Sequence, residues 1–198
     1  PYIGVGKDHG QALNFPPYNR TRRSQMNTVE HYLENSARGN PEPVCHTFQQ
    51  FVYFHGREFK PHPEPRRYFR KFGGVGQCFY NALKLVKKFP NDLTYVEGFA
   101  ASLFNGQTRP HLGLHAWAVT GSGEAVDPTW IDGVEFFGVP FDLNYVLKTA
   151  GNRRHFSVID NYHDDFPLLS GTHVDWRPAW DMARPFREGF IPYPISGP

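Results

Sequence analysis

The clearest periodic pattern of apolar and polar positions predicts a helix from Cys78 to Phe89. Four apolar side chains recur there at helical spacing and form one stripe: Ala82, Leu85, Val86 and Phe89. Lysines lie off this stripe or in the last turn, where their charge complements the negative end of the helix dipole. Pro90 follows and ends the element. We therefore expect an amphipathic helix with one buried face.

Upstream of this helix the pattern is shorter and less regular. Residues 1–24 predict an extended surface segment, and the apolar spacing in residues 26–37 predicts a helix. The aromatic run at residues 46–55 fits either a buried strand or a short helix, because periodicity cannot decide over so few residues. Residues 60–65, KPHPEP, predict a connector, since neither a helix nor a central strand tolerates this much proline.

Downstream the pattern changes to short runs that are typical of β-strands. Strands are expected over residues 94–102, 114–120 and 124–129, and the last two flank Gly121-Ser122-Gly123, a short hairpin turn. The remaining expected elements are a strand at 136–139, a helix around 143–149 and a strand at 155–160. A helix followed by an antiparallel sheet predicts the α+β class.

The composition indicates a globular chain whose core is rich in aromatic side chains. Hydrophobic residues make up 39% of the 198 residues, and aromatic residues reach 16%, including 18 Phe and 10 Tyr. No apolar run approaches the roughly 18 residues of a membrane span, so we expect no membrane contact. Two cysteines are too few for an extracellular disulfide scaffold, and we expect a cytoplasmic protein.

The net charge of +2 conceals an uneven distribution. Residues 1–76 carry eleven Lys and Arg against six Asp and Glu, whereas the rest of the chain is net negative. Two tight basic groups lie in the first part: Arg20, Arg22 and Arg23, and then Arg66, Arg67, Arg70 and Lys71. Basic segments with interleaved rings can track a phosphate backbone. The nearly balanced total charge favours solvated surface cations instead, so we do not expect a nucleic-acid partner.

The proline-rich connector is the best position for a boundary. We expect residues 1–65 to form a basic, Pro-rich N-terminal extension packed on the core. Residues 66–198 are then the core, with a C-terminal tail that is again rich in proline and aromatic residues.

Cys78 stands where a cysteine can act as a nucleophile. It follows Gly73-Gly74-Val75-Gly76-Gln77 and begins the predicted helix. The free N–H groups and positive dipole end of a helix N-terminus favour thiolate over thiol. The glycines allow a substrate carbonyl to approach the backbone, where the Cys78 N–H is a natural oxyanion donor. A lone cysteine is more often a small core residue, which is what we expect of Cys45.

The predicted hairpin brings a histidine and an aspartate to one face. With a three-residue turn, Trp117 faces Asp127 across the hairpin, and alternation places His115 on the same side. His115 and Asp127 are then diagonal neighbours with Cα atoms about 7–8 Å apart, which one hydrogen bond can bridge. A register slip of one residue would separate them. In this geometry Cys78 is the nucleophile, His115 the general base and then acid, and Asp127 orients the imidazolium.

Three short stretches together resemble the motifs of the transglutaminase-like cysteine enzymes. They are GQCFYNA at residues 76–82, HAWAV at 115–119 and VDPTW at 126–130. Their order and spacing fit, with 37 residues from Cys78 to His115 and 12 more to Asp127. The resemblance covers about residues 73–130, roughly a third of the chain.

The resemblance implies a papain-like core, in which a helix bearing the cysteine packs on an antiparallel sheet bearing the histidine and aspartate. It also implies a thioester formed with an acyl group from an amide, which water resolves by hydrolysis or deamidation and an amine by cross-linking. Members often complete the oxyanion hole with an upstream side chain, for which Gln49, Gln50 and Gln77 are the options here. Trp117 is either a packing residue of the site or a substrate contact.

We therefore expect a cysteine-dependent acyl-transfer enzyme that acts on amide bonds as a protease, amidase or deamidase, with transamidation as a variant. Its partner is then an amide-containing substrate, a protein or peptide, and we expect it to need no cofactor. The alternative is a catalytically idle relative that docks protein or nucleic acid through its basic N-terminal half.

A group of histidines and aspartates near the C-terminus is a candidate metal site. Its members are His163, Asp164, Asp165, His173 and Asp175. Imidazole and carboxylate groups suit zinc or iron, but the spacing fits no helical or zinc-knuckle pattern. We expect no metal.

Overall fold

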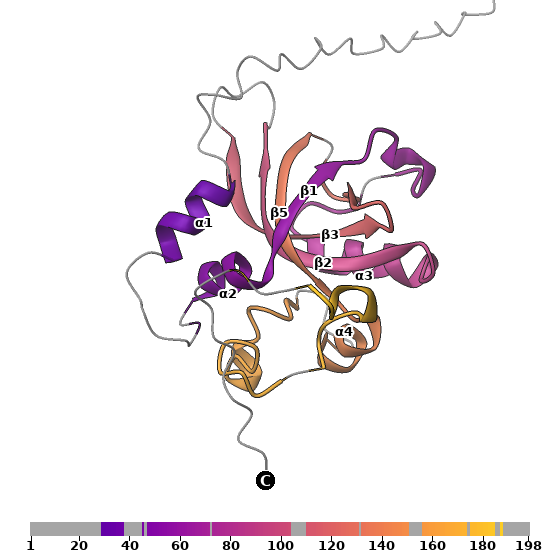
Figure 1. The fold of residues 1–198 in the computed structure, drawn as a ribbon. Coiled ribbons are helices and arrows are strands. Elements are labelled where there is room, and N and C mark those ends of the chain that lie inside the picture. Colours follow the sequence, from indigo (N-terminus) through magenta and orange to yellow (C-terminus); the bar gives the residue numbers. More distant parts are fainter. Residues whose placement is uncertain are drawn as a thin grey trace, which may run out of the picture.

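A closed barrel of five strands forms the centre of the molecule (Figure 1). The computed structural model describes residues 29–37, 45, 47–71, 73–103, 110–130, 132–150, 156–173, 175–184 and 187. The strands are β1 (Arg57–Pro61), β2 (Leu93–Ser102), β3 (His111–Thr120), β4 (Glu124–Val126) and β5 (Gly133–Phe141). The helices are α1 (Val29–Ala37), α2 (Phe48–His55), α3 (Cys78–Lys88) and α4 (Leu143–Ala150), with short 3₁₀ turns at Pro65–Arg67, Tyr162–Asp164 and Ala179–Asp181. The predicted α+β class is confirmed.

The strand order around the barrel is β1-β4-β3-β2-β5, and β5 pairs back with β1. The sheet is antiparallel except between β1 and β4, which are parallel. The sequence predicted an antiparallel sheet throughout. A parallel pair needs a long crossover connection, and here residues 62–123 supply it, including α3, β2 and β3.

The predicted hairpin has the expected register. Ala118 pairs with Val126 and Val119 with Ala125, and the Gly123 N–H donates to the Thr120 carbonyl over 2.9 Å to close the turn. β4 is shorter than predicted, so Asp127 lies directly after the strand. Helix α3 also matches its predicted range, with Phe89 as its C-cap.

The proline-rich stretch at residues 60–65 was predicted to be a connector. This prediction is wrong for its first two residues. Lys60 and Pro61 end β1 and lie opposite Glu124 and Ala125 of β4. Proline is tolerated at the end of a strand because only one ladder hydrogen bond is lost there. The predicted N-terminal extension therefore contributes β1 to the barrel.

Two segments take a form that local pattern could not decide. The aromatic run is helix α2, capped by Thr47, whose side chain accepts a hydrogen bond from the Gln50 N–H over 3.2 Å. The strand expected at residues 155–160 is wrong, because residues 156 and 157 have no regular structure and residues 158–160 form a bend outside the sheet. Predicted features at residues 1–24, 26–28 and 155, and most of the tail beyond 184, lie outside the described residues.

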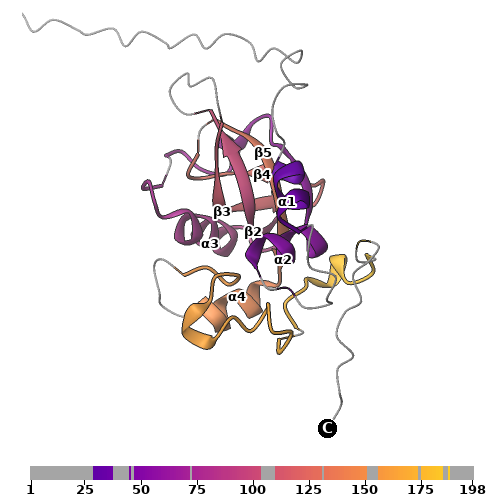
Figure 2. The same ribbon diagram turned by 90° about the vertical axis from the view of Figure 1, so that its left-hand side faces the viewer.

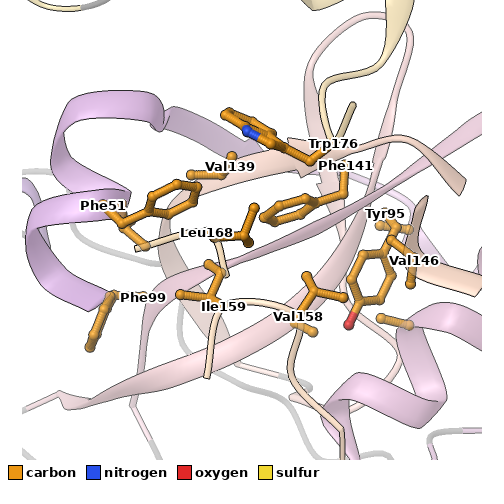
Figure 3. Packing of buried hydrophobic residues seen from close by; sticks show 14 of the residues in the cluster. Phe51, Tyr95, Phe99, Val139, Phe141, Val146, Val158, Ile159, Leu168 and Trp176 are labelled. Atoms are coloured by element: carbon orange, nitrogen blue, oxygen red, sulfur yellow. The ribbon is translucent and has the colours of Figure 1, made fainter. Parts of the chain in front are cut away.

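Two apolar clusters divide the core between the inside and the outside of the barrel. All five strands contribute to the inner cluster: Phe59, Val96, Ala100, Trp117, Val119, Ala125 and Phe136. The larger outer cluster joins the sheet to the helices and to the C-terminal segment, as Figure 3 shows for Phe51, Phe141, Ile159 and Trp176. Alternation along each strand produces this division.

The helices cover different parts of the barrel. α1 and α2 lie together on one side of the barrel and α3 lies apart from them against β2 and β3 (Figure 1), and α1 and α2 are seen in front of the sheet in the view turned by 90° (Figure 2). The N-terminus of α3 therefore meets the strand that carries His115. Among the described helices, none has the length and apolar character needed to cross a bilayer.

Candidate active site

Cys78 is the first residue of α3 and its side chain is half-buried. The loop before it is fixed at both ends. The Gly73 N–H donates to the Pro128 carbonyl over 2.7 Å, and the Gln77 N–H donates to the Gly74 carbonyl over 3.3 Å. Gly76 has φ +76°, a left-handed conformation that glycine adopts without strain. The thiol is thus held at a helix N-terminus, where N–H groups without helical partners gather.

Asn81 joins this loop to the turn after β4. Its buried amide donates to the Gly74 carbonyl and to the Thr129 hydroxyl, each over 3.1 Å. A Cβ atom at Gly73 would lie 2.1 Å from the Asn81 side chain, so only glycine leaves room for the amide. These bonds hold the cysteine helix and the aspartate turn at a fixed separation.

His115 and Asp127 form a buried pair. The distance from His115 Nε2 to Asp127 Oδ2 is 2.7 Å, and the two residues are 1% and 5% exposed. The second carboxylate oxygen of Asp127 accepts from the N–H groups of Thr129 at 2.7 Å and Trp130 at 3.1 Å. The turn therefore orients the carboxylate, and the carboxylate orients the imidazole.

Because Asp127 occupies Nε2, Nδ1 is the ring nitrogen of His115 that is left to face Cys78, which is close enough to raise the pKa of the ring. The ring is also stacked on Trp130, with centroids 3.9 Å apart and planes at 17°. A thiol beside an imidazole held in this way can pass its proton to the ring.

The charge balance around His115 favours the imidazolium. Burial lowers the pKa of His115, but the charge and hydrogen bond of Asp127, with smaller contributions from Cys78, outweigh it and raise the pKa from 6.5 to about 9. The site thus stabilises the state in which the ring has taken up a proton. Burial of Cys45 in the core raises the pKa of its thiol to about 12.

The predicted site residues divide into two groups. Cys78, His115 and Asp127 come together, and Gln77 lies beside them as the N-cap residue of α3. Gln49 and Gln50 are at neighbouring positions of another helix. They lie on α2, where Gln49 donates to the Tyr32 hydroxyl of α1 over 3.2 Å.

Trp117 lies on the same face of β3 as His115, as predicted. Its side chain points into the barrel, where it belongs to the inner cluster. Its side chain is 0% exposed and packs among Phe59 and Phe136. Of the two roles considered for Trp117, this placement matches packing, because a fully buried ring cannot touch a substrate.

Asn81, Tyr95 and Glu97 were missed from sequence. Tyr95 donates to the Glu97 carboxylate over 2.7 Å, and the charge of Cys78 is among the influences that raise the pKa of Tyr95, after burial and Glu97. For Asn81 and Glu97 the sequence holds a signal. Asn81 interrupts the buried face of the helix, and Glu97 occupies an apolar run in β2.

Three members of the C-terminal histidine and aspartate cluster, Asp164, His173 and Asp175, line one pocket without forming a ligand set. His173 accepts or donates a hydrogen bond with the Tyr145 hydroxyl at 2.9 Å, and Asp164 accepts from the Asn161 amide at 2.8 Å. Within the described ranges, no three His, Cys, Asp or Glu side chains gather as metal ligands would.

Comparisons with protein-family models, with curated proteins and with solved structures found no match to this chain. The chemistry of the site therefore has to be inferred from its own residues.

Proposed function

We propose that this protein is a cysteine-dependent acyl-transfer enzyme that cleaves an amide bond through a thioester on Cys78. The observation that carries the proposal is the line of side chains from Cys78 through His115 to Asp127, in which His115 and Asp127 lie 2.7 Å apart and Cys78 is close enough to His115 to raise the pKa of the ring. It begins at a half-buried thiol at a helix N-terminus and ends at a carboxylate held by two backbone N–H groups.

In the first step, the Cys78 thiol gives its proton to Nδ1 of His115 and Sγ attacks the carbonyl carbon of the amide. The electron pair of the C=O bond moves onto the oxygen. When the tetrahedral intermediate collapses, the C–N bond breaks and His115 donates its proton to the departing nitrogen, which leaves as an amine or ammonia. The acyl group stays on Sγ as a thioester.

In the second step, water attacks the thioester and gives one proton to His115. The C–S bond breaks, the carboxylic acid leaves, and the proton on His115 returns to sulfur. Amide and water have become acid and amine, and the enzyme is unchanged. An amine in place of water gives transamidation by the same route, so hydrolysis is the simplest assignment.

Two groups near Cys78 are suited to the developing oxyanion. The Cys78 N–H is among the first N–H groups of α3, which have no partner within a helix. The Gln77 side chain makes no capping hydrogen bond to α3, which leaves its amide available as the second donor. We therefore propose Gln77, rather than Gln49 or Gln50, as the side-chain donor.

The resemblance to transglutaminase-like enzymes points the same way. Its three motifs carry Cys78, His115 and Asp127 in that order, and we propose that the packing of α3 against β2 and β3 is a papain-like core. We propose a protein or peptide as the substrate. Because the reaction needs a reduced thiol, we propose a reducing compartment such as the cytoplasm.

The test is the rate at which iodoacetamide labels each cysteine at pH 7, followed by peptide mass spectrometry. We expect Cys78 to be labelled at least about tenfold faster than buried Cys45, and His115→Ala to remove most of this difference. His163→Ala, which removes an exposed histidine on the turn Tyr162–Asp164, is the matched control and should change nothing. Equal rates in the His115→Ala variant and the unchanged protein would overturn the proposal and favour the idle binding protein.

A further inference from the structure

A basic groove runs from the candidate active site along α3. It has a volume of about 570 Å³, and six cationic side chains line it: Arg66, Arg67, Arg70, Lys71, Lys84 and Lys88. One wall is the segment at residues 66–71, which is folded back by a hydrogen bond from the Arg66 guanidinium to the Arg70 carbonyl over 2.8 Å. The other wall is one face of α3.

One end of the groove is part of the site. Gly73 and Pro128 line this end, and they are the two residues whose backbones join the cysteine loop to the aspartate turn. Asn81, one helical turn after Cys78, lines it too. From Asn81 to Lys88 the groove follows α3 for about 10 Å, since a helix rises about 1.5 Å per residue. That length holds about three residues of extended peptide.

Among the described residues, few negative charges lie near the cations of the groove. No acidic residue is among the described residues that line it. Arg67, Arg70, Lys71, Lys84 and Lys88 form no ion pair within the part of the chain that the structure describes, and all five are exposed. Cations gathered in a groove raise the local concentration of anionic ligands.

The rings in the groove are already engaged by the protein. Tyr68 makes edge contacts with His62 at 5.5 Å and Phe89 at 5.7 Å, and Phe69 has the Arg66 guanidinium 5.9 Å from its centroid. Single-stranded nucleic acids bind by stacking bases on open rings. The occupied rings therefore favour an acidic polypeptide over a nucleic acid.

We infer that the groove binds an acidic segment of a polypeptide substrate and leads it to Cys78. This inference rests on the proposed function and adds the substrate class to it. Carboxylates on about three consecutive residues would meet the two basic walls while the adjoining amide lies at the thiol.

Binding is tested on the full chain carrying Cys78→Ala, so that no turnover interferes. The probe is a fluorescein-labelled hexaglutamate peptide, followed by fluorescence anisotropy in 50 mM NaCl. We expect the double variant Lys84→Glu/Lys88→Glu to weaken binding by about tenfold. The matched control Lys87→Glu/Lys148→Glu makes the same change in net charge at exposed lysines outside the groove and should retain binding.

Two results would overturn the inference at this stage. One is an equal loss of binding in both double variants, which would show that only net charge matters. The other is tighter binding of a labelled twelve-residue oligodeoxythymidine than of hexaglutamate, which would make the groove a nucleic-acid site.

The connection to the site is tested with Cys78 in place. Saturating unlabelled hexaglutamate should slow iodoacetamide labelling of Cys78 severalfold in the unchanged protein, and not in Lys84→Glu/Lys88→Glu. Peptide that binds without slowing the labelling would contradict the inference. The labelling rate without peptide reports on the proposed function alone, so the two failures are distinguishable.

Discussion

Asp127 uses both carboxylate oxygens, and each has a different task. One holds His115 at 2.7 Å, and the other fixes the turn through two backbone N–H groups. The turn that Asp127 fixes in this way begins directly after β4, which ends at Val126. A residue with a single acceptor oxygen can satisfy the turn but cannot also carry the charge that holds an imidazolium.

The pairing of His115 with Asp127 predicts a pH dependence of stability. The pKa of His115 is raised in the folded state from 6.5 to about 9. A histidine with a raised pKa contributes stability that is fully present below about pH 6.5 and is lost as the pH rises through 9. Asp127→Asn removes the charge but keeps an acceptor for the turn. We expect its free energy of unfolding to fall less than that of the unchanged protein over this window, by on the order of 1–3 kcal/mol.

Urea unfolding at pH 6.5, 7.5 and 9 measures this difference, and groups that titrate equally in both proteins cancel. Parallel stability curves for the two proteins would show that the pair does not favour the imidazolium.

At the level of the elements, the packing inside the barrel depends on a close approach between strands β2 and β5. Gly98 of β2 lies opposite Gly138 of β5, and the Trp117 ring fills the space beside Gly138. A Cβ atom at Gly138 would lie 2.6 Å from the Trp117 ring and 2.7 Å from the Glu97 carbonyl. The small barrel thus accommodates the large Trp117 ring because β5 lacks a side chain at Gly138.

Gly138→Ala should therefore destabilise the protein by about 1–3 kcal/mol, the usual cost of overpacking a core. Gly121→Ala is the matched control, since a Cβ atom there meets nothing within 4 Å. Thermal unfolding followed by circular dichroism compares the two variants. Equal melting temperatures would mean that β5 can shift without loss.

The local pattern of apolar and polar residues was sufficient to predict the elements whose stabilising contacts are close in sequence. The β3–β4 hairpin has a three-residue turn, so alternation alone placed His115, Trp117 and Asp127 on one face. The cysteine helix was equally clear, because its apolar stripe and the following proline are both local. Most of the candidate site follows from these two elements.

Long-range contacts decided what the sequence could not. The parallel pairing of β1 with β4 joins residues more than sixty positions apart, as Lys60 and Glu124 show. Residues 156–160 have the composition of a strand, yet they bend because the Glu97 carboxylate binds their N–H groups.

Glu97 links the barrel to the C-terminal segment of the whole molecule. This fully buried carboxylate accepts hydrogen bonds from the Tyr95 and Ser157 hydroxyls and from the Val158 and Ile159 N–H groups, at 2.6 to 3.1 Å. Burial raises its pKa from 4.5 to about 6, although the hydrogen bonds oppose the rise. The protein therefore keeps a carboxylate at its centre only by surrounding it with donors.

A raised carboxyl pKa means that stability is present in full below about pH 4.5 and is reduced as the pH rises through 6. We expect the unchanged protein to lose about 2 kcal/mol over this window relative to Glu97→Gln, which has no charge to gain. Gln donates where Glu accepts, so Glu97→Gln is less stable at every pH, and the comparison is of slopes. Chemical unfolding between pH 4 and 7 provides them, and identical slopes would contradict the assignment of Glu97 as the titrating group.

The closure of the barrel also bears on the order in which the chain can fold. β1 completes the ring by pairing with β4 on one side and with β5 on the other, and the last partner ends at Phe141. During synthesis β1 emerges long before either partner, so its backbone must wait unpaired while some eighty further residues are added. Contacts of this separation form late and slowly. The hairpin that aligns His115 with Asp127 can form early. The barrel that supports this hairpin can close only after β5 has been synthesised.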